Sequence, residues 1–280
     1  MMNSTEVIDS FTEFRKELHS FIFRLLPQRQ DADDIVQETY LKVMEHIDTF
    51  RGESSFKTWV FSIAFNLARN LLSKQKRWEE NSQDYGAMLH SHSEEHWAIF
   101  REVFDSTPDR NYEIAEHIAY CLNCINKTLP LAQQVCLLLK EIYQFKVSEI
   151  MSITDLSEGK VKHAIADARR HMIRIFDDRC SFVSKKGHCH QCTALKGILN
   201  PEQDAQIEAN RIALVRQGET ADQEHLLDLR LQLTGSIDPL NSPNSLLNIF
   251  MLEQREAWVE EGKKRNVLEV RPKSMAHLSK

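Results

Sequence analysis

Apolar residues recur at helical spacing along most of the chain, and this periodicity limits the fold more than any other feature. Val36, Tyr40, Val43 and Ile47 follow one another at intervals of four, three and four residues, which places them on one face of a helix. No stretch combines alternating apolar residues with flanking turn residues, the pattern typical of strands. The sequence therefore predicts an all-α protein.

The periodicity and composition divide the 280 residues into five segments. Helical domains are predicted at 1–78 and 112–177, joined by an acidic, weakly periodic linker at 79–111. A mainly helical extension that contains Cys and His follows at 178–261. The basic end, 262–280, is expected to be disordered.

Charge and apolar content narrow the class of protein. A net charge of -6 and a pI of about 6.1 do not indicate a uniformly basic nucleic-acid binder, but positive residues concentrate at 69–77 and 160–174. No apolar run is long enough to cross a bilayer and no signal peptide is evident, so a cytoplasmic protein without membrane insertion is expected. The sequence lacks a phosphate-binding loop and a defensible catalytic triad or carboxylate pair, so we expect no enzyme.

The helix predicted from Asp31, its expected N-cap, has an acidic face opposite its apolar stripe. That face carries Asp34, Gln37, Glu38 and Leu41, so a leucine lies within an acidic surface. Such a face suits docking to a basic partner. A solvated helix surface is the alternative.

A second helix is expected to follow a cap at Ser54 or Ser55, with an apolar stripe that starts at Phe56 and Trp59. Phe61 and Phe65 lie off this stripe, in line with Arg69. Two interpretations remain open for these rings. They stack on nucleic-acid bases, or they pack against the helix predicted at 8–26.

Two short helices near the end of the second block are joined by a tight turn. The first is predicted at 147–153, the turn contains Asp155, and Ser157 is the expected cap of the second helix. The exposed faces of that helix carry Lys160, Lys162, His163, Arg169, Arg170 and Arg174. This arrangement fits a helix-turn-helix that reads DNA, with an ordinary helical hairpin as the alternative.

Two groups of motifs carry a resemblance to a known family. The segments 31–43 and 50–70 resemble region two of sigma-70 family factors, and the segments 129–131 and 148–162 resemble region four. The space between them has no room for a full third domain, which favours the extracytoplasmic-function (ECF) group. At the turn, Asp155 stands where the family often has glycine, and aspartate tolerates left-handed geometry.

The resemblance, which covers about residues 8–176, implies roles for specific residues. Docking on the clamp coiled coil of the polymerase β′ subunit falls to Asp34, Gln37, Glu38 and Leu41. The residues expected to contact the minus-ten promoter element are Arg51, Gly52, Glu53, Ser54, Ser55, Phe56, Asn66, Arg69 and Asn70. Contact with the minus-thirty-five element or the β-flap falls to Ser157, Lys160, Lys162, His163 and Arg169.

The implied partners are RNA polymerase core and promoter DNA, with an anti-sigma factor left open. The implied function is promoter recognition and transcription initiation, and it requires no cofactor. Two rival functions remain: a stand-alone helix-turn-helix regulator, and an enzyme that uses a thiol or a metal.

The cysteines are interpreted by their surroundings. Cys121 and Cys136 lie in apolar helical stripes, so burial is expected for both. A denser cluster places Cys180, His188, Cys189 and Cys192 close together around a glycine, with His190 as an alternative to His188. These residues form a candidate zinc site, whereas a thiol switch and plain packing are the alternatives.

Overall fold

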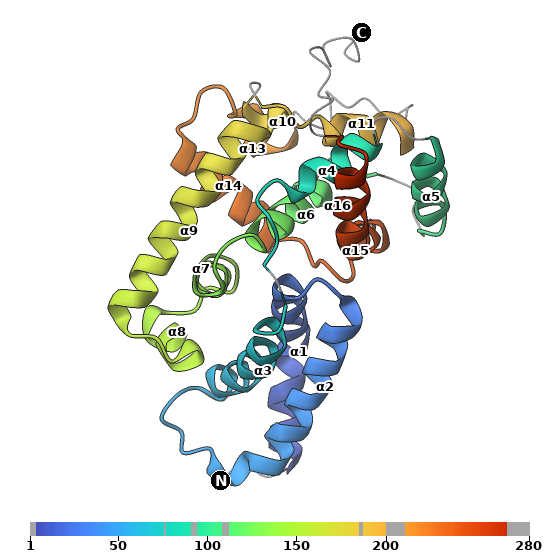
Figure 1. The fold of residues 1–280 in the computed structure, drawn as a ribbon. Coiled ribbons are helices and arrows are strands. Elements are labelled where there is room, and N and C mark those ends of the chain that lie inside the picture. The colour runs from blue at the N-terminus through green and yellow to red at the C-terminus, as the bar shows by residue number, and fades with distance from the viewer. Residues whose placement is uncertain are drawn as a thin grey trace.

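The computed structural model describes residues 4–75, 77–90, 94–107, 112–184, 187–199 and 211–267. Within these residues every regular element is a helix, and the β-bridge between Cys180 and Cys189 lies outside any strand. The all-α prediction is confirmed (Figure 1). The segment boundaries drawn from the sequence stay predictions.

The first three helices form a body at the bottom of Figure 1. They are α1 (Ser4–Leu25), α2 (Arg29–His46) and α3 (Phe56–Leu72), with the short η1 (Ile47–Thr49) after α2. Phe61 and Phe65 are buried in this body, and the Phe61 ring centroid lies 5.3 Å from that of Phe21 on α1. The packing interpretation of these rings is therefore correct, and the stacking interpretation is wrong.

One of the two helix caps predicted in this body is confirmed and the other is wrong. Ser55 is the N-cap of α3, and its side chain accepts a hydrogen bond from the Thr58 backbone N–H at 3.1 Å. Asp31 is not the N-cap of α2, because that helix begins at Arg29 after Gln28. Pro27 cannot continue α1, so the chain turns there. Helix α2 then begins at Arg29, before the expected cap Asp31.

The second helical body comprises α6 (Ile114–Asn126), α7 (Leu131–Leu137), η2 (Leu138–Ile142), α8 (Val147–Thr154) and α9 (Glu158–Arg179). Asp155 joins α8 to α9 with φ of 58°, in the left-handed region predicted for it. Ser157 occupies the N-cap position of α9, although its side chain makes no capping hydrogen bond. The helix-turn-helix geometry is present as expected.

The segment expected to be a linker contains two helices, α4 (Ser82–His90) and α5 (Glu94–Asp105). Phe100 of α5 is buried, with its ring centroid 5.8 Å from those of Phe250 and Trp258. Those partners come from the extension, more than 140 residues along the chain. The expectation of a simple linker was wrong because α4 and α5 bury their apolar faces against a part of the chain that local periodicity cannot identify.

The extension is mainly helical, as predicted. Its helices are α10 (Ser181–Ser184), α11 (Gln191–Leu199), α13 (Ala213–Arg216), α14 (Gln223–Gly235), α15 (Ser245–Glu253) and α16 (Arg255–Lys264). The end expected to be disordered from Gly262 is corrected in part, because Gly262 lies inside α16. A Cβ at this position would come within 2.5 Å of the Tyr85 ring. Residues 268–280 lie outside the described residues.

The two predicted domains pack directly against each other. Phe61 of α3 lies 4.9 Å from Phe145, measured between ring centroids, and the Thr58 hydroxyl donates to the Glu149 carboxylate at 3.2 Å. Ser20 of α1 shares a hydrogen bond of 2.9 Å with Tyr143. Helices α1 and α3 therefore pack against α8 and the turn that precedes it.

Lys127 lies in a buried position that should make stability depend on pH. Its Nζ donates to the carbonyls of Phe23 and Arg24, and burial lowers the pKa of Lys127 from 10.5 to about 7. Above pH 7 the unfolded chain therefore binds one more proton here than the folded chain. The free energy of unfolding should rise with pH, by up to about 1.4 kcal/mol per pH unit, until the unfolded lysine titrates.

Urea unfolding of the parent and of Lys127→Met between pH 7.0 and 8.5 tests this expectation. The variant should lose most of the slope, whereas Lys16→Met, at an exposed position on α1, should keep it. Equal slopes in the parent and in Lys127→Met would show that Lys127 keeps an ordinary pKa.

Candidate nucleic-acid interface

Helix α2 presents the predicted docking face to solvent. Asp34, Gln37, Glu38 and Leu41 are all exposed, and Leu41 is 57% exposed. The contacts that Asp34 and Glu38 make are local to α2, since Gln30 donates to Asp34 at 2.9 Å and Lys42 lies 3.8 Å from Glu38. The structure thus brings all four predicted residues onto one accessible face.

The predicted minus-ten residues fall into two exposed groups. In the loop before α3, Arg51, Gly52, Glu53 and Ser55 are exposed, whereas Ser54 and Phe56 are half-buried. Gly52 has φ of 73°, which favours glycine at this turn. On α3 itself, Asn66, Arg69 and Asn70 are exposed at spacings of three and one residues, and they lie toward one side of the helix.

An aromatic cluster lies beside this loop and was not singled out from the sequence. Phe50, Phe56 and Trp59 are half-buried, with ring centroids 5.2 to 6.0 Å apart. From the sequence, Phe56 and Trp59 were expected in the apolar stripe of the helix, and Phe56 also among the minus-ten contacts. Their partial exposure leaves ring surface next to Arg51 and Ser55, where an unstacked base could contact it.

The predicted minus-thirty-five residues separate into an exposed group, in which Lys162 pairs with Glu158 at 2.6 Å, and the less exposed Arg169. Ser157, Lys160, Lys162 and His163 are exposed at the start of α9. Arg169, three turns further on, has a side chain only 19% exposed. It lies 3.2 Å from Glu141, 2.9 Å from Glu224 and 2.6 Å from Asp228. Arg169 is thus bound by carboxylates in this arrangement.

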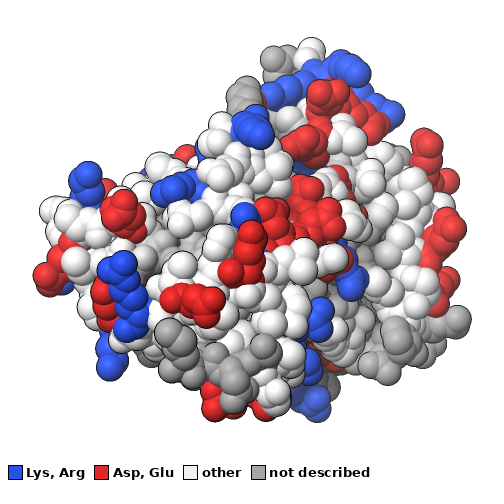
Figure 2. All heavy atoms as spheres, turned by 90° about the horizontal axis from the view of Figure 1, so that it is seen from below, with Lys and Arg blue, Asp and Glu red and all other residues white. Residues whose placement is uncertain are grey.

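Charge is mixed on the face that Figure 2 shows, with lysine and arginine interspersed among acidic side chains. This face does not form one continuous basic surface. The mixture agrees with the net charge of -6.

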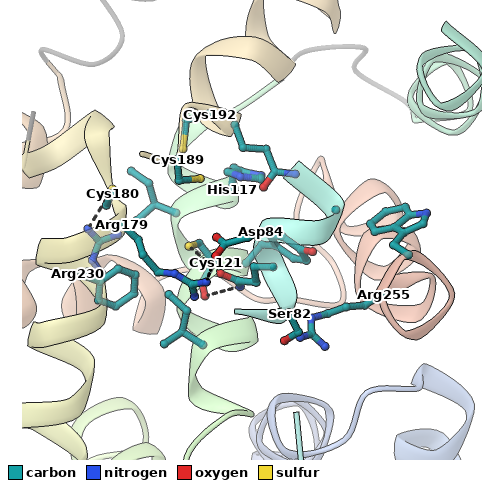
Figure 3. A pocket seen from close by; sticks show the side chains of 18 residues that line it. Ser82, Asp84, His117, Cys121, Arg179, Cys180, Cys189, Cys192, Arg230 and Arg255 are labelled. Carbon is teal, nitrogen blue, oxygen red and sulfur yellow. Dashed lines mark hydrogen bonds and ion pairs between the residues drawn. The ribbon is translucent and has the colours of Figure 1, made fainter. Parts of the chain in front are cut away.

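The cysteines of the extension meet Cys121 of α6 around a small cavity of about 40 Å³ (Figure 3). Cys180 follows α9, Cys189 pairs with it through the β-bridge, and Cys192 lies on α11. The Arg230 guanidinium donates to the Cys180 sulfur at 3.7 Å. The cluster therefore joins α6, α9, α11 and α14.

The predicted zinc ligands do not form a metal-binding group. The described residues contain no set of three or more Cys, His, Asp or Glu that could hold a metal ion. His188 instead pairs with Asp84 at 3.2 Å, and burial raises the pKa of Cys189 to about 11. The pairing of His188 with Asp84 favours the packing alternative, and the zinc site stays a prediction. Cys136 is fully buried as expected, whereas Cys121 is half-buried.

Residues 11–78 match the model of sigma-70 region 2, which places this three-helix body among sigma-70 type factors. The ECF RNA polymerase sigma-E factors of Escherichia coli K12 and Salmonella typhimurium LT2 are each 31% identical over 156 residues, covering 56% of this chain and 78% of the relative. The sigma-E factor of Haemophilus influenzae is 28% identical over 141 residues, covering 50% and 72%.

A solved structure of the sigma factor RpoE with the anti-sigma factor NepR from Bartonella quintana is similar at a TM-score of 0.41 and 18% identity. It covers 61% of this chain and 96% of that one. The sequence relatives establish the family, and this chain belongs to the ECF RNA polymerase sigma factors. No helix in the described part of the chain is long and apolar enough to cross a membrane.

Proposed function

We propose that this sigma factor binds polymerase core through the exposed face of α2 formed by Asp34, Gln37, Glu38 and Leu41. The observation that carries the proposal is the exposure of Leu41, 57%, within an acidic helix face. Covering a large exposed apolar side chain with a partner removes its surface from water, which is favourable for binding. The partner is expected in the cytoplasm, where RNA polymerase works.

We assign promoter contact to two surfaces, one on the loop before α3 and on α3 itself, the other at the start of α9. The loop 51–56, with Asn66, Arg69 and Asn70, faces the minus-ten element, where the half-buried rings beside the loop support unstacked bases. The start of α9, with Ser157, Lys160, Lys162 and His163, faces the minus-thirty-five element. The amino-terminal end of a recognition helix is the part that enters the major groove.

The two rival functions have less support. A stand-alone helix-turn-helix regulator has no use for an exposed acidic docking face on a separate helical body. A thiol enzyme needs an activated cysteine, but burial raises the pKa values of Cys121, Cys189 and Cys192. We therefore assign a non-enzymatic role that requires no cofactor.

Replacing both Lys160 and Lys162 by alanine should change promoter selection. Both side chains are exposed at the start of α9, and lost base contacts typically cost about 1–3 kcal/mol each. Run-off transcription from a library of minus-thirty-five sequences, with the parent and the variant, measures the change. Lys16→Ala with Lys264→Ala, which removes two exposed lysines elsewhere, is the control. An unchanged sequence preference would refute this placement of α9.

A further inference from the structure

Helix α14 of the extension contacts both sigma regions at once. Near its carboxyl end, the Thr234 carbonyl accepts a hydrogen bond of 2.9 Å from Arg24 of α1, and the Ile237 carbonyl accepts one of 2.8 Å from the same guanidinium. Arg24 is 2% exposed, so this contact is built into the core. The extension is thereby fixed to region two.

The amino-terminal half of α14 contacts region four. Glu224 and Asp228 lie 2.9 and 2.6 Å from the Arg169 guanidinium of α9. The two carboxylates are one turn apart, so both reach the same arginine. Between its two ends, α14 buries Leu227 and Leu231 with Ala168 and Met172 of α9. One helix therefore spans the junction between the two regions.

The arrangement that α14 holds cannot read a promoter. Elements centred near minus ten and minus thirty-five are about 25 base pairs apart, or about 85 Å along the DNA axis. A compact chain of this length has a radius of gyration of about 19 Å. With α3 in contact with α8 through Thr58 and Glu149, the two DNA-reading surfaces cannot span that distance.

We propose that α14 and the turn after it form an internal clamp that holds regions two and four in a closed, inactive arrangement. The inference rests on the proposed promoter contacts and adds a role for the extension. Arg169 is the point of competition, because a guanidinium bound by Glu224 and Asp228 is not available to a DNA phosphate or to polymerase. Opening must break these ion pairs and separate α3 from α8.

Neutralising the clamp carboxylates tests the proposal in the full chain. Glu224→Gln with Asp228→Asn leaves the fold intact, because both side chains are exposed, 61% and 58%. At limiting sigma factor, this variant should raise run-off transcription by about three- to tenfold over the parent. Glu256→Gln with Glu260→Gln, two exposed acids of α16, is the matched control and should behave as the parent does.

A distance measurement separates opening from other causes. Fluorophores at Glu13 on α1 and Ser152 on α8, both exposed, are introduced through unnatural amino acids so that the six native thiols stay unlabelled. The clamp variant should show a larger open population than the parent before polymerase is added, and both proteins should open with core and promoter.

The outcomes distinguish the clamp from the underlying function. If the parent transcribes and the variant neither opens nor transcribes more, the clamp is wrong and the promoter-binding function stands. If neither protein directs transcription by active core, the proposed function fails and the clamp fails with it.

Discussion

Changing both Asp34 and Glu38 to lysine should weaken binding to RNA polymerase core by at least about 30-fold, because disrupting charged contacts at an interface costs about 2–5 kcal/mol. Both side chains are exposed on α2 and their contacts are local to that helix, so the folded state should survive the change. Fluorescence anisotropy of labelled protein titrated with core measures the loss. The parent's affinity should also fall as salt increases.

The control for this variant carries the same charge change elsewhere. Glu256→Lys with Glu260→Lys alters two exposed acids of α16 and should bind core with an affinity close to that of the parent. If the Asp34 and Glu38 double variant is folded, as judged by circular dichroism, and binds core undiminished, the docking face lies elsewhere.

Arg24→Met should lower the free energy of unfolding by about 3–5 kcal/mol. The guanidinium is 2% exposed and donates hydrogen bonds to Tyr143, Asn123 and the carbonyls of Thr234 and Ile237. Methionine fills similar space but leaves these buried acceptors without their donor. The loss should therefore far exceed that of a surface arginine.

Urea unfolding followed by circular dichroism gives the comparison. Arg15→Met, on the exposed side of the same helix, should change the free energy of unfolding by less than about 0.5 kcal/mol. A cost at Arg24 as small as that at Arg15 would mean that the contacts joining α1, α6 and α14 do not stabilise the fold.

Features set by nearby residues were predictable from the sequence. The cap at Ser55, the left-handed turn at Asp155 and the exposed acidic face around Leu41 each depend on a few adjacent positions and on helical period. Local patterns of this kind specify which face of a helix is apolar. They do not specify which element will cover that face.

Features that depend on distant partners were missed or left open. The helices at 82–90 and 94–105 pack on α15 and α16, and Trp97, Phe100 and Phe104 already had helical spacing without an identifiable partner. Phe61 and Phe65 could be assigned to the core only once α1 was in place. In the sequence Arg24 had no visible signal, because its acceptors lie about 100 and 210 residues away.

Ligand density in the cysteine cluster predicted which thiols gather, but not the partner of His188. Cys180, Cys189 and Cys192 do gather around one cavity with Cys121, as their density suggested. The expected fourth ligand, His188, pairs with Asp84 instead, and Asp84 belongs to a segment taken for a linker. Cys192 is buried there and packs as a small apolar side chain.

Run-off transcription tests the central claim most directly. Purified core polymerase is incubated with this chain and a library of promoter fragments, and the transcripts are mapped to their start sites. We expect discrete transcripts only when the chain is present, from fragments that share two sequence elements at a fixed spacing. Folded chain that adds no start site to core, in an assay where the same core responds to another sigma factor, would contradict the account.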